Sequence, residues 1–327
     1  NYKTYPNLIS FFKENKIEVE KSNMSFSVSV KETDIEYCGN GLNGIFSNRT
    51  NLFRTKFLKM FFEILSFYKK SSKLKNINES ETLGDFLEKN KFSNFFINYH
   101  IIPMVSAIWS MPPREAKLMP LIFFINFFQN HGLFKLKNRP QWYTVSHRSK
   151  TYVNKVLNKI SGEYFKNYKV NKIKRNPHGV EIYYGDKSEF FTYDKVILAT
   201  HADEALSLIE NPLDQEKDIL SKFGYKKNIA IIHTDEVAMP KNKKVWSSWN
   251  SSIDKVDFKK NSITYWLNLL QNFKINKNIF LTLNPFFEID ENKILNKINF
   301  THPYYNYEAL RNQKRLNLLQ NKKNILF

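Results

Sequence analysis

The sequence predicts a mixed α/β protein, and three observations lead to that prediction. Segments in which apolar and polar residues alternate, such as 25–30, indicate half-buried strands. Segments whose apolar residues recur at helical spacing, such as 5–16, indicate helices. The continuous apolar segment 195–200 runs directly into a helix start, as a buried strand of a parallel sheet does. With 327 residues the chain is long enough for two domains.

The first part of the chain is expected to be mainly helical, with two early strands. These elements are a helix over 5–16, strands over 25–30 and 34–38, a helix with a basic end over 52–70, and helices from Glu81 to about Gly132. The apolar segment 118–128 has 11 residues, whereas a helix that crosses a bilayer needs about 20. A core helix is therefore favoured at 118–128, and an element that dips into a membrane surface is the alternative.

Strands dominate the second part. The expected elements are a helix over 152–160, strands over 168–174, 179–184, 189–193 and 195–200, a helix that opens at 201–206, strands over 228–233, 262–267 and 279–283, and a last helix over 307–320. The chain begins at Asn1 without Met and ends on the apolar residues 324–327, which resemble the opening of a buried strand. We therefore expect it to be an internal piece of a longer protein.

The charge and the cysteine content exclude several classes of protein. There are 50 Lys and Arg residues against 31 Asp and Glu residues, a net charge of +19. Most of the basic residues are Lys, spread evenly, and no zinc spacing or RNA-binding aromatic motif occurs, so no nucleic-acid partner is predicted. The single cysteine, Cys38, excludes a disulfide scaffold and favours a reducing, cytoplasmic location. No metal site is predicted, because HxxxH and HExxH spacings are absent.

Residues 39–44 read GNGLNG, a literal GxGxxG. A dinucleotide-binding loop needs a buried parallel strand before it and a helix N-terminus after it. Here the preceding strand is polar and alternating, and no acidic residue closes a second strand about 20 positions further on. A turn is therefore predicted at 39–44.

The segment 196–201 carries a stronger signal. A parallel strand that ends on small residues allows a ligand to approach its backbone, and ligands of open α/β sheets bind at the carboxyl ends of strands. The alternative is a plain corner between strand and helix, with Thr200 or Asp203 as the cap. His201 and His233 lie near Asp203 and Asp235 in the sequence. No nucleophile motif accompanies them, so a structural role is favoured over a hydrolase triad.

Aromatic residues gather at 246–250 and 264–268. Such density on strands is typical of a core. The alternative is the wall of a pocket that faces a flat cofactor or an apolar substrate.

Taken in order along the chain, the motifs resemble the flavin-containing amine-oxidase-like proteins, specifically the bacterial branch of NAD/FAD-binding oxidoreductases. The resemblance covers essentially the whole chain. The motifs that carry it are residues 4–8, 24–28, 41–44, 139–142, 149–153, 196–203, 233–235, 239–240, 246–250, 264–266 and 302–303.

The resemblance implies a discontinuous, Rossmann-like FAD-binding domain into which a substrate domain of mixed sheet and helices is inserted. The substrate domain would take residues 1–138 and 213–300, and the FAD-binding domain would take 139–212 as its middle segment and begin its C-terminal segment at 301–327. The first βαβ unit with its glycine loop, and the C-terminal glycine-rich segment, would lie outside these 327 residues. Where broader relatives carry a Gly-Gly pair before the Ser, this chain has His147 and Arg148.

The same resemblance assigns site residues and a reaction. Val170 would lie by the adenine of FAD, Ser149 would lie near the flavin, and the segment of Ala199, Thr200 and His201 would approach the dinucleotide. The substrate side would be lined by Trp249, Tyr265 and Trp266. No catalytic base is assigned, because the flavin takes the hydride and the protein mainly orients and desolvates the substrate.

The implied activity is transfer of a hydride from a small amine, or from an apolar or lipidic substrate, to FAD. The alternative is a catalytically inactive module of the same fold that binds lipids or a membrane surface. Its motivation is the basic end of the helix at 52–70, with Lys69 and Lys70. Peripheral membrane contact is therefore expected alongside the cytoplasmic location.

Overall fold

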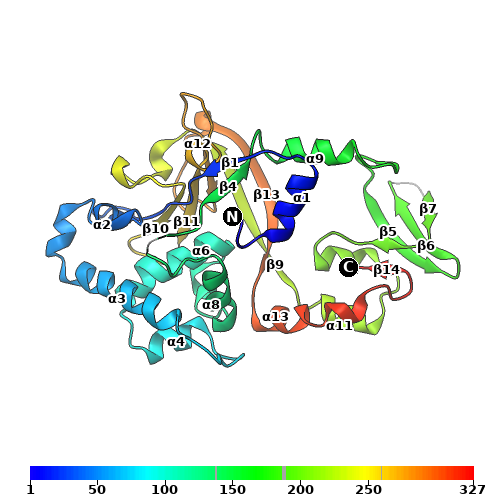
Figure 1. Ribbon diagram of the computed structural model, residues 1–327, viewed down its shortest axis with the longest axis horizontal. Coiled ribbons are helices and arrows are strands. Elements are labelled where there is room, and N and C mark those ends of the chain that lie inside the picture. The colour runs from blue at the N-terminus through cyan, green and yellow to red at the C-terminus, as the bar shows by residue number, and fades with distance from the viewer. Residues whose placement is uncertain (137, 186–188, 259) are drawn as a thin grey trace. The chain divides into compact units, whose positions relative to one another are not determined.

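The computed structural model describes residues 1–136, 138–185, 189–258 and 260–327 (Figure 1). The chain forms two compact units. Unit 1 contains Asn1–Lys159 and Lys227–His302, and unit 2 contains Ile160–Lys226 and Pro303–Phe327. Both units are mixed α/β, as predicted. The assignment of FAD-binding and substrate roles to segments that change at 138/139, 212/213 and 300/301 stays a prediction.

Unit 1 is built on a seven-stranded mixed sheet with the strand order β13-β9-β12-β11-β10-β2-β3. β10 and β2 run parallel, with Asn250 opposite Ser27, whereas β11 runs antiparallel to both β10 and β12. A separate antiparallel pair joins β1 to β4. The bounds are β1 Val19–Ser22, β2 Phe26–Val30, β3 Glu36–Cys38, β4 Trp142–Val145, β9 Gly224–His233, β10 Trp249–Ile253, β11 Asn261–Trp266, β12 Phe280–Leu283 and β13 Ile294–Tyr304.

A row of buried polar side chains crosses five strands of this sheet. Ser27 Oγ donates to Asn250 Oδ1 at 2.7 Å, and Asn250 Nδ2 donates to the carbonyl of Thr264 at 3.1 Å. The hydroxyls of Thr264 and Thr282 are 2.9 Å apart, and His233 Nε2 lies 2.7 Å from the Thr282 hydroxyl. All five side chains are fully buried. Because each buried polar atom needs its partner, a one-residue slip of any of these strands would leave several of them unpaired.

The helices of unit 1 enclose an aromatic core. Phe67 lies at its centre, and its ring centroid is within 6.4 Å of those of Phe86, Phe92, Phe96, Phe124 and Phe134. The helices are α1 Pro6–Glu14, α2 Gly41–Ile45, α3 Thr55–Ser71, α4 Leu83–Lys89, α5 Asn94–Phe96, α6 Ile102–Trp109, α7 Pro113–Ala116, α8 Leu121–Asn130, α9 Ser149–Leu157 and α12 Leu267–Leu270. A π-helical turn, Ile97–Ile101, joins α5 to α6.

Helix α8 is a core helix, as favoured from the sequence. Its Leu121, Phe124, Ile125 and Phe128 are buried. Over the described ranges, the helices are all too short or too polar to cross a membrane.

The described residues of unit 2 form two small sheets and three α-helices. The antiparallel sheet β5-β6-β7 is followed by a parallel pair of β8 and β14. The bounds are β5 Val170–Asn176, β6 Gly179–Tyr184, β7 Phe190–Tyr193, β8 Val196–Ile197, β14 Ile325–Leu326, α10 Ala202–Leu208, α11 Asp214–Leu220 and α13 Tyr307–Gln313. The predicted strand at 324–327 is confirmed, and Ile325 is fully buried.

Two sequence-based predictions about unit 2 are wrong in detail. The strand at 195–200 is not buried on both faces, since Val196 and Leu198 are buried while Ile197 is 73 % exposed. Only one of its faces packs into the cluster of Ile173, Val180, Ala205, Ile209 and Ile325. The helix predicted over 307–320 ends at Gln313, because Arg315 N–H bonds three residues back to Asn312 O, and the 3₁₀ turn Leu316–Leu319 follows.

Candidate functional site

The end of β8 gives an open approach to the backbone in unit 2. Ala199 and Thr200 are exposed, and His201 is the N-cap of α10. The His201 ring stacks on Tyr225, with centroids 4.3 Å apart and an interplanar angle of 18°. The Tyr225 hydroxyl accepts a hydrogen bond from Ala202 N–H at 2.7 Å, and burial raises the pKa of Tyr225. Tyr225 therefore fixes the junction between β8 and α10, while the backbone at Ala199 and Thr200 stays open to solvent.

These residues fit one part of a dinucleotide site. Small side chains at the exposed end of a parallel strand are what close approach of a cofactor to the backbone requires. Val170, the first residue of β5, packs against the same apolar cluster as Val196. Val170 and the segment 199–201 thus belong to one unit and one core.

The GxGxxG segment does not fit a phosphate-binding loop. It follows β3, which pairs antiparallel with β2 at the edge of the unit 1 sheet. A turn was predicted at 39–44, whereas the chain bends at Gly39 and Asn40 and the short helix α2, Gly41–Ile45, takes up the rest. A Cβ atom on Gly44 would lie 2.7 Å from Cys38 Sγ. Gly44 is therefore required by packing, whereas a dinucleotide loop follows a parallel strand.

Ser149 opens α9 in unit 1 after a strained turn. The two preceding residues, His147 and Arg148, have positive φ values of 59° and 77°. Thr151 Oγ1 donates to His147 O at 2.9 Å, and the Arg148 guanidinium lies 4.1 Å from the Phe273 ring centroid. Left-handed backbone at two bulky residues is unusual and marks a place where surrounding contacts impose the conformation.

The predicted substrate-side aromatics are divided between the two faces of the unit 1 sheet. Trp249 and Tyr265 are directly opposite each other on β10 and β11, and their rings meet edge to face with centroids 4.8 Å apart. Trp266 is the next residue along β11 and therefore points to the other face. There it contacts Trp246 edge to face, with centroids 5.4 Å apart. Burial raises the pKa of Tyr265 far above its ordinary value.

His233 has the structural role favoured from the sequence. Besides its bond to Thr282, its Nδ1 accepts the backbone N–H of Asp235 at 3.1 Å. Burial is the main cause that lowers the pKa of His233. In the described parts of the chain, no group of three or more His, Cys, Asp or Glu side chains could hold a metal ion.

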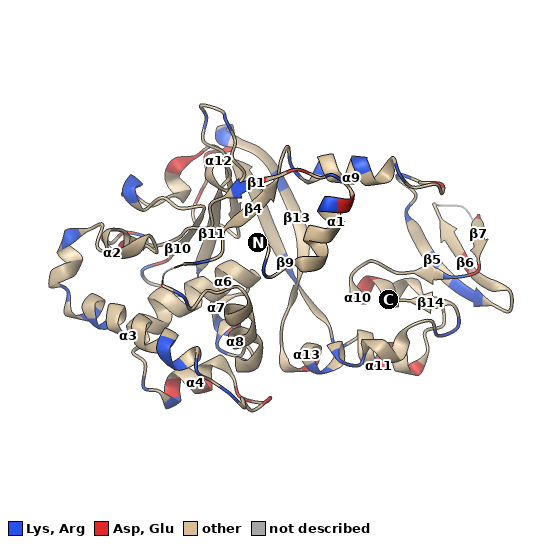
Figure 2. Ribbon diagram, viewed as in Figure 1, with Lys and Arg blue, Asp and Glu red and all other residues tan. Residues whose placement is uncertain are grey.

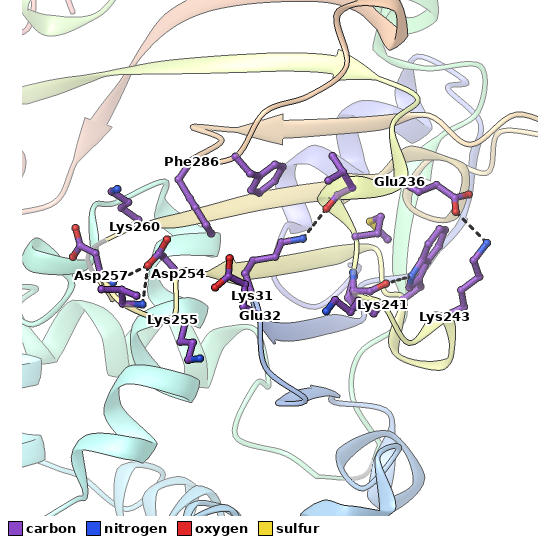
Figure 3. Close-up of a pocket in the computed structure, with 16 residues that line it drawn as sticks. Lys31, Glu32, Glu236, Lys241, Lys243, Asp254, Lys255, Asp257, Lys260 and Phe286 are labelled. Carbon is purple, nitrogen blue, oxygen red and sulfur yellow. Dashed lines mark hydrogen bonds and ion pairs between the residues drawn. The ribbon is translucent and has the colours of Figure 1, made fainter.

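A cavity of about 700 Å³ in unit 1 was not predicted from the sequence. Figure 3 shows Lys31 among the side chains that line it, with its Nζ donating to Val237 O at 2.6 Å. Lys31 also lies over the Phe287 ring at 4.9 Å, and burial lowers the pKa of its ammonium group. The aromatic lining includes Trp246 and Phe286. Because the lining comes from four separate segments, no local sequence signal marks this cavity.

Comparison with known proteins places this fold among amine oxidases and related enzymes. No family model and no curated protein matches the sequence. Among solved structures, the chain is similar to a CLA-producing fatty acid isomerase from P. acnes, with a TM-score of 0.62 and 10% identity over 99% of this chain and 78% of that one. It is similar to wild-type putrescine oxidase bound to putrescine, with a TM-score of 0.60 and 10% identity over 98% and 79%.

A third similar structure is cyclohexylamine oxidase from Brevibacterium oxydans IH-35A, with a TM-score of 0.58 and 11% identity over 99% of this chain and 79% of that one. At such identities the likeness concerns the fold. It agrees with the resemblance of the ordered motifs, which rests on the sequence alone. The chain therefore has the fold of the flavin amine-oxidase-like proteins.

Proposed function

We propose that this chain is the larger part of an FAD-dependent oxidoreductase that removes a hydride from a small amine or from an apolar, lipidic substrate. One observation carries the proposal: structures of amine oxidases match the fold over 98% to 99% of the chain. FAD would supply the hydride acceptor. The residues of the chain would bind and orient the cofactor and keep water from the substrate.

In this proposal unit 2 belongs to the cofactor domain. Val170 lies by the adenine, and the open strand end at Ala199 and Thr200 lets the dinucleotide approach the backbone. His201 keeps that junction in shape through its stack on Tyr225. The proposal includes a first βαβ unit with a glycine loop that is not among these 327 residues, because the only GxGxxG of the sequence is built for packing against Cys38.

Unit 1 belongs to the substrate domain, with Ser149 near the flavin. The Trp249 and Tyr265 pair supplies an aromatic wall of the kind that holds apolar or cationic amine substrates. Burial raises the pKa of the Tyr265 hydroxyl still further above neutral pH, so the group is a poor base. Tyr265 is therefore suited to shape the pocket rather than to remove a proton.

The experiment compares this chain with a version extended at both ends by its genomic flanks. We expect the extended protein to purify with the visible absorbance bands of oxidised flavin. Absence of those bands from the extended protein would overturn the cofactor assignment and favour the inactive lipid-binding module.

A matched pair of variants tests the strand end. In the extended protein, Ala199→Trp fills the open approach and should lower the flavin content. Thr192→Trp places the same side chain at an exposed position elsewhere in unit 2, in strand β7, and should leave the flavin content unchanged.

A further inference from the structure

One corner of unit 1 exposes four large apolar side chains within 21 residues of sequence. We name residues 41–62 the α2–α3 corner; it comprises α2, the 3₁₀ turn Arg49–Phe53 and the first half of α3. Phe53 is 87 % exposed, Phe62 64 %, Leu42 63 % and Leu52 41 %. Contiguous exposed apolar residues mark an interaction site more often than single ones do.

Packing beneath the corner holds these side chains in place. The Phe46 ring, just after α2, lies 5.5 Å from Phe61 and 6.0 Å from Phe57 on α3. Phe57 is fully buried and Phe46 nearly so. Phe62 follows Phe61 on the same helix, and their ring centroids are 5.5 Å apart. The exposed apolar residues therefore project from a rigid base.

The charged residues within the segment 41–62 are all basic. The sequence contains no Asp or Glu between Tyr37 and Phe62, but it contains four basic residues there: Arg49, Arg54, Lys56 and Lys59. Figure 2 shows the Lys and Arg of α3 in blue. Lys56, Lys59 and Phe62 recur every third position, which puts them on the exposed face of the helix. Arg54 alone among the four forms an ion pair within the described residues, with Asp34 at 3.2 Å.

We propose that the α2–α3 corner docks onto an anionic lipid surface. Phe53 and Phe62 would enter the boundary between headgroups and acyl chains, and Lys56, Lys59 and Arg49 would lie against the acidic headgroups. An anionic lipid surface offers hydrocarbon and negative charge together, which matches this combination of side chains. A nucleic acid offers phosphates and bases for stacking, but Leu42 and Leu52 have no ring with which to stack.

The corner differs from the membrane element expected from the sequence. That expectation placed the contact at the basic end of the helix. In the structure, Lys70 donates to Asn90 Oδ1 at 3.0 Å and lies 5.5 Å from the Phe92 ring centroid, and both Lys69 and Lys70 are exposed. Contact at that end of the helix stays a prediction. The exposed apolar and basic residues instead meet at the start of α3. The inference does not rest on the flavin proposal, because it uses no residue assigned to cofactor or substrate.

Co-sedimentation of the 327-residue chain with vesicles tests the inference. One set of vesicles is phosphatidylcholine alone, and the other contains phosphatidylserine as well. We expect binding to the phosphatidylserine vesicles that weakens with salt. The paired variant Lys56→Glu with Lys59→Glu should lower the partition coefficient about tenfold or more, and Phe53→Ser with Phe62→Ser should lower it comparably.

Matched controls change similar residues elsewhere on unit 1. Lys274→Glu with Lys277→Glu reverses two exposed charges, and Val256→Ser with Leu295→Ser removes two side chains that are 86 % and 56 % exposed. Both controls should bind as the parent does, and circular dichroism should show all variants folded. Equal loss in test and control variants would overturn the inference. So would equal binding to neutral vesicles, or retention on DNA without binding to vesicles.

Discussion

Trp249 and Tyr265 face each other across the pairing of β10 and β11, with ring centroids 4.8 Å apart and ring planes at 78°. Edge-to-face contact of this kind is worth about 1 kcal/mol beyond the area it buries. The indole Nε1 of Trp249 is buried without a hydrogen-bond partner among the described residues. The pair thus combines a favourable contact between two rings with one buried N–H group that has no hydrogen-bond acceptor among the described residues.

Two substitutions at Trp249 separate these contributions. Trp249→Ala should lower the free energy of unfolding by about 2–3 kcal/mol, since it deletes a half-buried aromatic ring. Trp249→Phe keeps the ring contact and removes the unpaired donor, so its effect should stay within about 1 kcal/mol. Urea denaturation followed by circular dichroism measures both. Equal losses in the two variants would contradict the assignment of the stability to the ring contact.

Arg175 and Glu216 form a buried ion pair in unit 2. The exposed fractions of their side chains are 13% and 0%, and Glu216 also accepts the backbone N–H of Leu213 at 2.8 Å. Arg175→Ala should destabilise unit 2 by about 3–5 kcal/mol, because it leaves a buried carboxylate unpaired. The double variant Arg175→Met with Glu216→Leu should recover most of that loss in thermal unfolding. If the double variant is no more stable than Arg175→Ala, the loss does not come from the unpaired carboxylate of Glu216, and the prediction is wrong.

Gly44 lies too close to Cys38 to carry a side chain. A Cβ atom there would lie 2.8 Å from the Cys38 carbonyl oxygen as well as 2.7 Å from Sγ. Gly44→Ala should therefore destabilise unit 1 by about 1–3 kcal/mol. Gly39→Ala is the matched control, since the nearest atom to its Cβ would be 3.8 Å away. Chemical denaturation of the two variants side by side checks the difference, and equal midpoints would refute the packing role of Gly44.

His100 makes unit 1 sensitive to mild acid. Burial, followed by the charge of Arg139, lowers the pKa of His100 to about 3 from an ordinary 6.5. The unfolded chain therefore binds a proton at a higher pH than the folded chain, and stability falls as the pH falls from 6.5 towards 3. Between pH 6.5 and about 5 the loss from this group alone should be about 1.6 kcal/mol.

The variant His100→Asn tests that dependence. Its amide can replace the ring Nδ1, which lies 3.0 Å from the Tyr37 hydroxyl. The difference in stability between pH 6.5 and about 5 should shrink by about 1.6 kcal/mol in this variant. Burial also lowers the pKa of His131 and His233, and these contributions are common to both proteins. An unchanged pH dependence would contradict the shifted pKa.

Periodicity predicted the elements well where one face of a segment meets a core. Helix α3, predicted from the strongly apolar segment 52–70, buries Phe57, Met60, Ile64 and Phe67, which lie on one face at helical spacing. The burial of the segment 195–200 was harder to predict. A continuous apolar sequence does not show whether one face of the strand or both faces pack against other residues. In β8 only one face meets the core, since Ile197 points away from it.

For the candidate site, the sequence could predict only which residues lie together because they are adjacent along the chain. Ala199, Thr200 and His201 stay together at one junction for that reason. Tyr265 and Trp266 are adjacent in the sequence, yet the period of two in a strand sends their side chains to opposite faces. Lys31 and Phe287 meet in the cavity although more than 250 positions separate them, and no local pattern anticipates such a contact.

The buried thiol of Cys38 can report how often the edge of the unit 1 sheet opens. It is the only thiol in the sequence, its side chain is 1 % exposed, and it lies in β3 at the edge of the sheet. A thiol-reactive dye can label it only when that edge strand detaches. Where reclosing is fast, the labelling rate is the intrinsic reaction rate multiplied by the fraction of molecules open at that edge. The opening equilibrium of one strand pairing can thus be followed without introducing a second cysteine by mutation.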